Sequence, residues 1–156
     1  MFKIDQLREY IIKPALTDLV MLSDSAVELL VFTCATESDG GSYVHQVNGP
    51  ALGIYQMEPA TYNDIWQNFI KPRGHLLMML LSAFECVNMP SEDRIIYDLR
   101  FATAMARLHY ARVPEHIPPA NDVEGLWEYY KFHWNTPAGA AKKDDSIAKY
   151  YKLTSG

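Results

Sequence analysis

The segment from Ala26 to Thr36 places hydrophobic residues at nearly every position, so a helix built from it has no polar face. Such a helix has to be covered by neighbours on all sides, and we expect it to be the central helix of the fold. Ser25 and Glu28 have the spacing of a capping box, which predicts that the helix begins at Ala26. Gly40 and Gly41 predict its end, because glycine readily adopts the left-handed conformation that closes helices.

Helical periodicity recurs elsewhere, and no repeat, low-complexity tract or linker divides the chain. Further helices are predicted at residues 5–21, Pro59 to Phe69, a segment after Gly74, Glu92 to Ala111, Asn121 to Trp134 and Asp144 to Leu153. Pro14 is expected to break or bend the first of these. Asn121 and Glu124 form a cap-like pair at the start of the helix that reaches Trp134, and Thr136-Pro137 ends it. The segment from Ser42 to Ile54 is rich in Gly, Pro and Asn, and predicts a loop or short hairpin with residues 43–47 as a strand. We therefore expect one all-α domain over residues 1–156, with a small irregular or β insertion.

The net charge of −5 provides no basic face for phosphates, so the chain is not expected to bind nucleic acid. It also argues against adsorption to acidic wall polymers by charge alone. The first residues show no signal peptide, which predicts synthesis in a cytoplasm. The longest strongly apolar run, Leu76 to Leu81, is too short to cross a bilayer, so no stable membrane insertion is expected.

Cysteine and histidine usage argues against a metal centre or a disulfide framework. Cys34 and Cys86 do not form a CxxC pair, and we expect two buried, reduced thiols. The five histidines show no HExxH spacing, which argues against a zinc amidase, and no glycine-rich phosphate loop is present. No metal or cofactor is expected.

Glu37 is the strongest candidate for chemistry. It follows the apolar helix directly, so its carboxyl group is expected to be partly desolvated, which raises the pKa of a carboxylate. The carbonyl end of a helix disfavours negative charge and acts in the same direction. A carboxylic acid that stays protonated near neutral pH can protonate a glycosidic oxygen. The alternative is a glutamate that only closes a helix in water.

A second segment favours the catalytic interpretation. Glu37-Ser38 is followed by Gly53-Ile54-Tyr55-Gln56-Met57-Glu58-Pro59-Ala60-Thr61, and later by His133-Trp134-Asn135-Thr136-Pro137-Ala138-Gly139. In order and spacing the first two segments resemble the motifs of the lysozyme-like lytic transglycosylases, the group related in fold to goose-type lysozymes. The third segment is a weaker counterpart of another motif of that family. The compact form of these motifs is more similar to bacteriophage-encoded members of the family than to bacterial periplasmic members. The resemblance implies a lysozyme-like helical domain that cleaves peptidoglycan glycan strands.

The resemblance also implies roles for individual residues. Glu37 would be the catalytic acid/base, Ser38 would orient a sugar substituent, and Tyr55 and Gln56 would line the cleft. Asn135 would approach Glu37 from the far side; the family has a tyrosine before this asparagine, whereas this chain has Trp134. Structural alternatives exist for these residues. Gln56 could bind only loop backbone, Asn135 could only cap a helix, and helical spacing places Trp127, Tyr130 and Trp134 in the core.

A single carboxylate fits a transglycosylase, in which the muramic C6 hydroxyl attacks the anomeric carbon and a 1,6-anhydro product forms. Asp39, Glu58 or Asp64 could instead position a water and make the chain a hydrolytic muramidase. A non-catalytic protein that retains the fold is the third alternative. Because the chain has neither a signal peptide nor a separate wall-binding domain, we expect it to be carried in a phage particle among other virion proteins. An endolysin is the runner-up.

Overall fold

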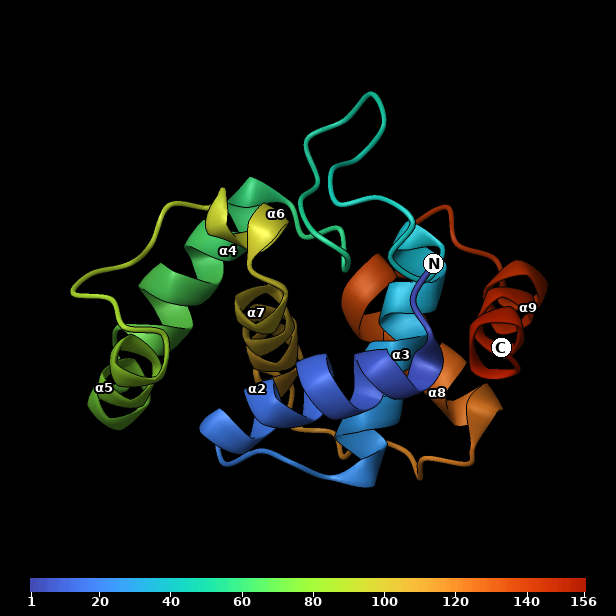
Figure 1. Cartoon of the computed structure of the whole chain (residues 1–156), viewed down its shortest axis with the longest axis horizontal. Helices are drawn as coiled ribbons and strands as arrows, with labels where there is room; N and C mark the ends of the chain where they lie inside the picture. The colour runs from blue at the N-terminus through green and yellow to red at the C-terminus, as the bar shows by residue number, and fades with distance from the viewer.

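The computed structural model describes all 156 residues, which form a set of short and medium helices packed around one central helix (Figure 1). The predicted all-α fold class is confirmed. No sheet is present, and the predicted strand at residues 43–47 is wrong: β pairing is limited to isolated bridges from Leu52 to His45 and to Met57. The segment between Gly40 and Pro59 is thus the irregular insertion, and it projects from the helices as a long loop (Figure 1).

Helix α3 (Asp24–Ser38) is the central helix, as its apolar sequence predicts. Ten of its fifteen residues are buried, and it contacts η1, α7, α8 and α9. Phe32 lies between two tyrosines of the surrounding helices, with ring centroids 5.7 Å from Tyr130 and 5.5 Å from Tyr150. The C-terminal end of α3 is therefore held in place from several sides.

The start of α3 differs from the prediction. The N-cap is Ser23, whose hydroxyl accepts a hydrogen bond from the Ala26 amide at 3.1 Å. The capping box of Ser25 and Glu28 is wrong, because the Glu28 carboxylate is bound at 2.7 Å by the guanidinium of Arg8. The Glu28 side chain therefore forms a long-range ion pair with Arg8 instead of the predicted local cap.

The end of α3 agrees with the prediction. Asp39, Gly40 and Gly41 have φ values of 52°, 69° and 82°, so the chain turns away through three left-handed residues. The amino-terminal residues cover this turn: the Phe2 amide donates a hydrogen bond to the Gly40 carbonyl at 2.8 Å. A Cβ atom at Gly41 would lie 2.4 Å from the Phe2 ring, and one at Gly40 would lie 2.8 Å from the Met1 side chain. Glycine is required at both positions.

The first helical run consists of α1 (Ile4–Gln6), the π-helical segment η1 (Leu7–Ile12) and α2 (Lys13–Asp18). Pro14 does not break it. This proline lies in the first turn of α2, where a missing amide proton is tolerated, and the wider π turns precede it.

The middle of the chain forms α4 (Pro59–Ile65), the π segment η2 (Trp66–Ile70), α5 (Gly74–Ala83), α6 (Arg94–Tyr97) and α7 (Leu99–Ala111). A single helix over residues 92–111 is wrong. Asp98 leaves the helical conformation and its carboxylate accepts a hydrogen bond from the Phe101 amide at 3.0 Å, so α7 begins anew after it.

The last part comprises α8 (Val123–Tyr130), the π segment η3 (Lys131–Asn135) and α9 (Lys143–Thr154). The cap of α8 is Asp122 rather than Asn121, since the Asp122 carboxylate accepts from the Gly125 amide at 2.9 Å. Helix α9 packs along α3 on the side opposite α4 and α5 (Figure 1).

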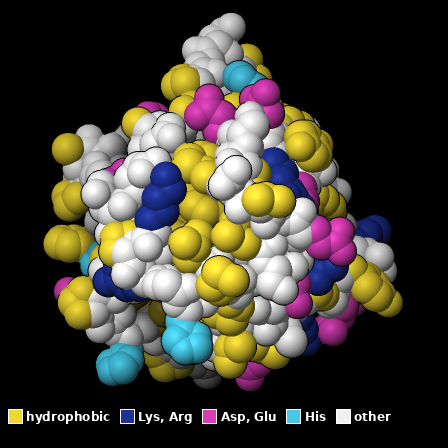
Figure 2. Space-filling view, turned by 90° about the vertical axis from the view of Figure 1, so that its left-hand side faces the viewer, with side chains coloured by type: hydrophobic (Ala, Val, Ile, Leu, Met, Phe, Trp, Pro, Cys, Tyr) yellow, Lys and Arg dark blue, Asp and Glu magenta, His cyan; other side chains and the backbone are white.

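Figure 2 shows hydrophobic side chains gathered on the side of the molecule where α5 lies. Within α5, Leu76 and Leu80 are buried, whereas Met78 is exposed. None of the helices combines the length and the hydropathy of a membrane span.

Candidate active-site cleft

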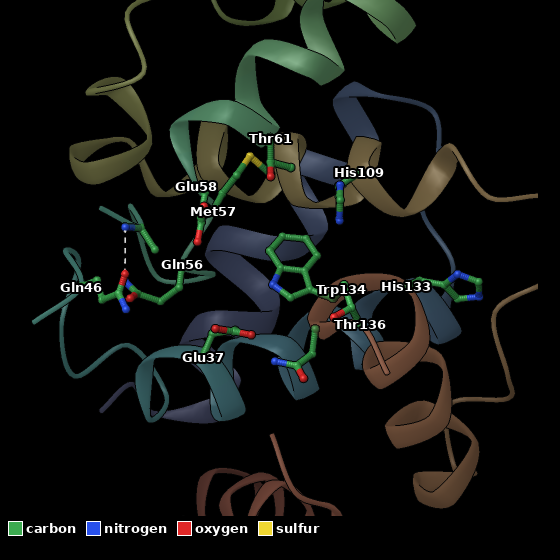
Figure 3. Close-up of a pocket in the computed structure, with 12 residues that line it drawn as sticks. Glu37, Gln46, Gln56, Met57, Glu58, Thr61, His109, His133, Trp134 and Thr136 are labelled. Atoms are coloured by element: carbon green, nitrogen blue, oxygen red, sulfur yellow. Dashed lines mark hydrogen bonds between the residues drawn. The ribbon is translucent and has the colours of Figure 1, made fainter. Parts of the chain in front are cut away.

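A cavity of about 420 Å³ opens where the end of α3, the insertion, the start of α4, the end of α7 and η3 meet (Figure 3). Its lining residues are mostly polar: Glu37, Gln46, Ala51, Gln56, Met57, Glu58, Thr61, His109, His133, Trp134, Asn135 and Thr136. Four of the six residues predicted for the site lie here: Glu37, Gln56, Trp134 and Asn135. Segments nearly a hundred residues apart in the sequence thus meet at one cleft.

Glu37 lies in the last turn of α3 with its side chain at the edge of the cavity (Figure 3). One carboxylate oxygen, Oε1, accepts a hydrogen bond from the Tyr130 hydroxyl at 2.6 Å. The Glu37 backbone carbonyl accepts a second bond, from the Tyr43 hydroxyl at 2.8 Å. Two tyrosines therefore hold both ends of this residue, one from α8 and one from the insertion.

Burial raises the pKa of Glu37 from 4.5 to about 7, and the hydrogen bond from Tyr130 and the charge of Lys149 oppose this rise in part. Desolvation, the first cause expected from the sequence, is thus the main one. A group with this pKa is present in both protonation states near neutral pH, so it can give a proton and take one back.

Tyr130 is the residue that the sequence analysis missed, because its helical spacing placed it in the core. Its ring is indeed buried, but its hydroxyl reaches the carboxylate of Glu37. The resemblance predicts a tyrosine hydroxyl at the position before Asn135, but Trp134 has none. The hydroxyl that contacts Glu37 comes instead from Tyr130, one helical turn earlier.

Ser38 does not reach the cleft, so its predicted substrate contact is wrong for this structure. The side chain is fully buried, and its hydroxyl donates to the Ile54 carbonyl at 2.7 Å. It also accepts from the Gly41 amide at 2.9 Å. Ser38 therefore fastens the insertion to the end of α3 beside Glu37.

Tyr55 is also absent from the cleft. It is 1% exposed, and its hydroxyl is hydrogen-bonded to that of Thr103 at 2.9 Å in the core. Burial raises the pKa of Tyr55 well above its ordinary value. The preceding turn places Gln56, not Tyr55, on the cleft side of the insertion.

Gln56 combines the two roles that the sequence left open. Its Nε2 atom donates to the Gly53 carbonyl at 2.9 Å, which is the loop-bonding role, and the residue also lines the cavity. Its φ of 53° lies in the left-handed region, which is uncommon for glutamine. The loop geometry therefore turns this side chain toward the cleft.

Trp134 and Asn135 form the wall contributed by η3. The Trp134 indole lies edge-on to the His109 ring with centroids 4.6 Å apart; it lines the cavity and also packs against the core beside Tyr110 (Figure 3). The Oδ1 atom of Asn135 accepts a hydrogen bond from Lys131 at 2.7 Å. Asn135 is the last residue of η3, so it ends the helix and lines the cleft at the same time.

Of the three further acidic residues considered from the sequence, only Glu58 lines the cavity. Asp64 forms an ion pair with Arg112 at 2.6 Å, and Asp39 lies 3.8 Å from Lys152. In Figure 3, Glu58, Met57 and Thr61 occupy the side of the cavity across from Glu37. The cleft thus holds two carboxylates in different surroundings, because Glu58 is exposed and Glu37 is partly buried.

No group of three or more His, Cys, Asp or Glu side chains is arranged to hold a metal ion. His109 is partly buried, its Nδ1 lies 2.7 Å from Arg112, and its pKa is lowered to about 4 by desolvation and by that arginine. It is therefore neutral at physiological pH and supports Trp134. No protein family, curated protein or solved structure matched the chain.

Proposed function

We propose that the chain is a glycoside-cleaving enzyme with Glu37 as its acid/base. The observation that carries this proposal is the partly buried carboxyl group at the edge of an open polar cleft, with its pKa raised to about 7 and its orientation fixed by Tyr130. Proton donation to a leaving oxygen requires such a group.

More particularly, we propose a peptidoglycan lytic transglycosylase that cleaves between N-acetylmuramic acid and N-acetylglucosamine. The support is the resemblance of Glu37-Ser38 and Gly53 to Thr61 to that family, together with the direct bond from Ser38 to the Ile54 carbonyl that joins the two segments. Gln56, Trp134 and Asn135 are the proposed sugar-binding side chains around the acid.

The proposed reaction has two proton transfers. Protonated Glu37 gives its proton to the glycosidic oxygen as the bond from that oxygen to the muramic C1 breaks, and N-acetylglucosamine leaves with a free hydroxyl. Ionised Glu37 then accepts the proton of the muramic C6 hydroxyl while the C6 oxygen bonds to C1. The product is a 1,6-anhydro ring, no water is consumed, and Glu37 ends protonated as it began.

Mass spectrometry of digested peptidoglycan tests the proposal. Wild-type protein is expected to release fragments with 1,6-anhydro ends, and Glu37→Gln is expected to lose activity by a factor of about a thousand or more, since it removes the proton donor while keeping the shape. A folded Glu37→Gln variant with most of the wild-type activity would show that the catalytic assignment is wrong. Equal absence of cleavage in both proteins favours a non-catalytic wall-binding or virion protein.

A hydrolytic muramidase is the second candidate, favoured by the presence of Glu58 in the cleft. A carboxylate across from the acid could activate water on the other face of the sugar. Hydrolysis gives a reducing end one water heavier than the anhydro product, so the same spectra separate the two reactions. Loss of the hydrated product in Glu58→Gln, with Thr61→Val as a control in the same wall, would identify Glu58 as the base.

We also propose that a bacteriophage particle carries the protein and that it opens the wall locally. The support is the similarity of its motifs to phage-encoded forms and the net charge of −5, which gives no adsorption to acidic wall polymers. Proteomics of purified particles tests this: the protein is expected in the virion. Abundant free protein late in infection and none in particles favours an endolysin.

A further inference from the structure

A second cavity, of about 410 Å³, lies among the start of α3, the end of α7, the segment after α7 and α8. It shares no lining residue with the cleft around Glu37. Arg107 of α7 and the buried Tyr129 of α8 are among its lining residues, with the hydroxyl-bearing Ser25 of α3. This cavity has no part in the proposed function.

Arg107 differs from the other arginines of the chain. Arg8, Arg94, Arg100 and Arg112 each form an ion pair with a carboxylate, and Arg73 lies over the Phe69 ring. Arg107 belongs to none of the ion pairs, and its buried Nε atom has no hydrogen-bond partner. It is the one arginine whose charge has neither a carboxylate nor an aromatic ring as its partner.

The surroundings of Arg107 make this lack of a partner costly. Burial lowers the pKa of Arg107 from its ordinary value, which means that the protein disfavours its charged form. A guanidinium remains charged even so, and a desolvated charge without a partner destabilises the fold. A negative group bound in the cavity would offset this cost.

We propose that the cavity binds an oxyanion, a phosphate or carboxylate group, through the guanidinium of Arg107. The planar fork of an arginine matches two oxygens of such a group. Ser25 adds a hydroxyl whose side chain forms no hydrogen bond within the chain, and the His116 ring also lines the cavity.

One acidic residue also lines the cavity. The carboxylate of Glu115 is exposed, and the side chain within ion-pair distance of it is the His133 ring, with 3.9 Å between Oε2 and Nε2. It lies outside ion-pair distance of Arg107, so it does not neutralise the arginine. A bound anion would be nearer to Arg107 than Glu115 is.

Thermal unfolding of the full chain at constant ionic strength tests the proposal. Inorganic phosphate and an N-acetylated dipeptide with a free C-terminal carboxylate are the two probes, and sodium chloride is the reference. At least one probe is expected to raise the Tm of the wild type in a saturable manner. Tighter binding of inorganic phosphate would identify the ligand group as a phosphate, and tighter binding of the dipeptide would identify it as a peptide carboxylate.

Arg107→Gln is expected to weaken that binding at least tenfold, and Arg73→Gln, which removes an equal charge elsewhere, is expected to leave it unchanged. Without a probe, Arg107→Gln is expected to be at least as stable as the wild type, because an unpartnered charge is gone. Arg107→Lys, which keeps the charge but not the fork, is expected to bind severalfold more weakly than the wild type and provides the comparison should the glutamine variant not fold. No saturable shift in the wild type, or equal binding by the Arg107 variants, would overturn the proposal.

Discussion

The ionised form of Glu37 lowers the stability of the folded chain. In the folded chain its pKa is about 7, against an ordinary value of 4.5. Below pH 4.5 both states are protonated and the group has no effect on stability. Between these two values the unfolded chain releases the proton first, so folding becomes less favourable as the pH rises. Above pH 7 the loss is complete.

Glu37→Gln is therefore expected to be more stable than the wild type at pH 8, by up to about 3 kcal/mol, and of similar stability at pH 4. The amide oxygen of glutamine can still accept the hydrogen bond from Tyr130. Denaturant unfolding of both proteins at the two pH values measures this. Equal stability at pH 8 would mean that the carboxyl group is not desolvated.

Tyr130→Phe is expected to move the alkaline limb of the activity profile to higher pH. The hydroxyl stabilises ionised Glu37, so its removal raises the pKa of that carboxyl group further. Activity at the optimum should remain within about tenfold of the wild type, because one charge-assisted hydrogen bond contributes about 1.5 kcal/mol. Tyr43→Phe, which loses a bond to the Glu37 backbone instead, should leave the limb in place.

The two cysteines are both free, but their surroundings differ. Cys34 is fully buried in α3, where burial raises its pKa to about 12, whereas Cys86 is only partly buried, which corrects the expectation of two buried thiols. In the native protein Cys86 is expected to react with a thiol reagent and Cys34 only after unfolding. Intact mass before any oxidant should show both reduced; a loss of two hydrogens would contradict this.

At the scale of residues, the sequence could predict those site residues that stand in a local sequence motif, but not those that reach the site from a distant segment. Glu37 and Gln56 stand in recognisable local patterns, and both lie at the cleft. Tyr130 reaches Glu37 across 93 positions of sequence, and no local pattern distinguishes its hydroxyl from that of a core tyrosine. Ser38 and Tyr55 are adjacent to cleft residues in sequence, but the backbone turns their side chains into the core.

At the scale of elements, the periodic patterns predicted most helices, and the errors lie at caps and breaks. Asp98 illustrates the reason. An aspartate within an apolar-periodic segment is compatible both with a continuous helix and with a new N-cap, and only the packing of α6 against α7 decides between them. The same ambiguity explains why the sequence predicted Asn121 as the cap of α8, whereas the structure has Asp122 there.

Asp98→Ala is expected to lower the free energy of unfolding by about 1 to 2 kcal/mol. It removes the cap bond to the Phe101 amide and the ion pair with Arg94 at 2.9 Å. Asp93→Ala, at the start of α6 without a side-chain cap bond, is the matched control and should change stability by less than about 0.5 kcal/mol. Urea unfolding monitored by circular dichroism compares them; similar losses in both variants would rule out the cap.

At the scale of the molecule, the cleft forms where helices from all parts of the chain end. The end of α3 supplies Glu37, the proposed acid, α8 and η3 supply Tyr130 and Trp134, and the insertion supplies Gln56. The π-helical turns of η3 widen the helix at the wall of the cleft, a feature often found beside functional sites. A hydrophobic pattern predicts that helices pack, but it does not predict this widening, because η3 is a short segment of five residues, none of which is fully buried.

The covering of the α3 turn by the amino-terminal residues has a practical consequence for handling the protein. Met1 and Phe2 are in contact with Gly40 and Gly41, three and four residues beyond the proposed acid. An affinity tag fused at that end would compete with this contact and could displace the turn, so purification through a carboxyl-terminal tag is preferable. Leu153 of α9 also touches Gly40, whereas Gly156 is exposed, which leaves room for a fusion after the last residue.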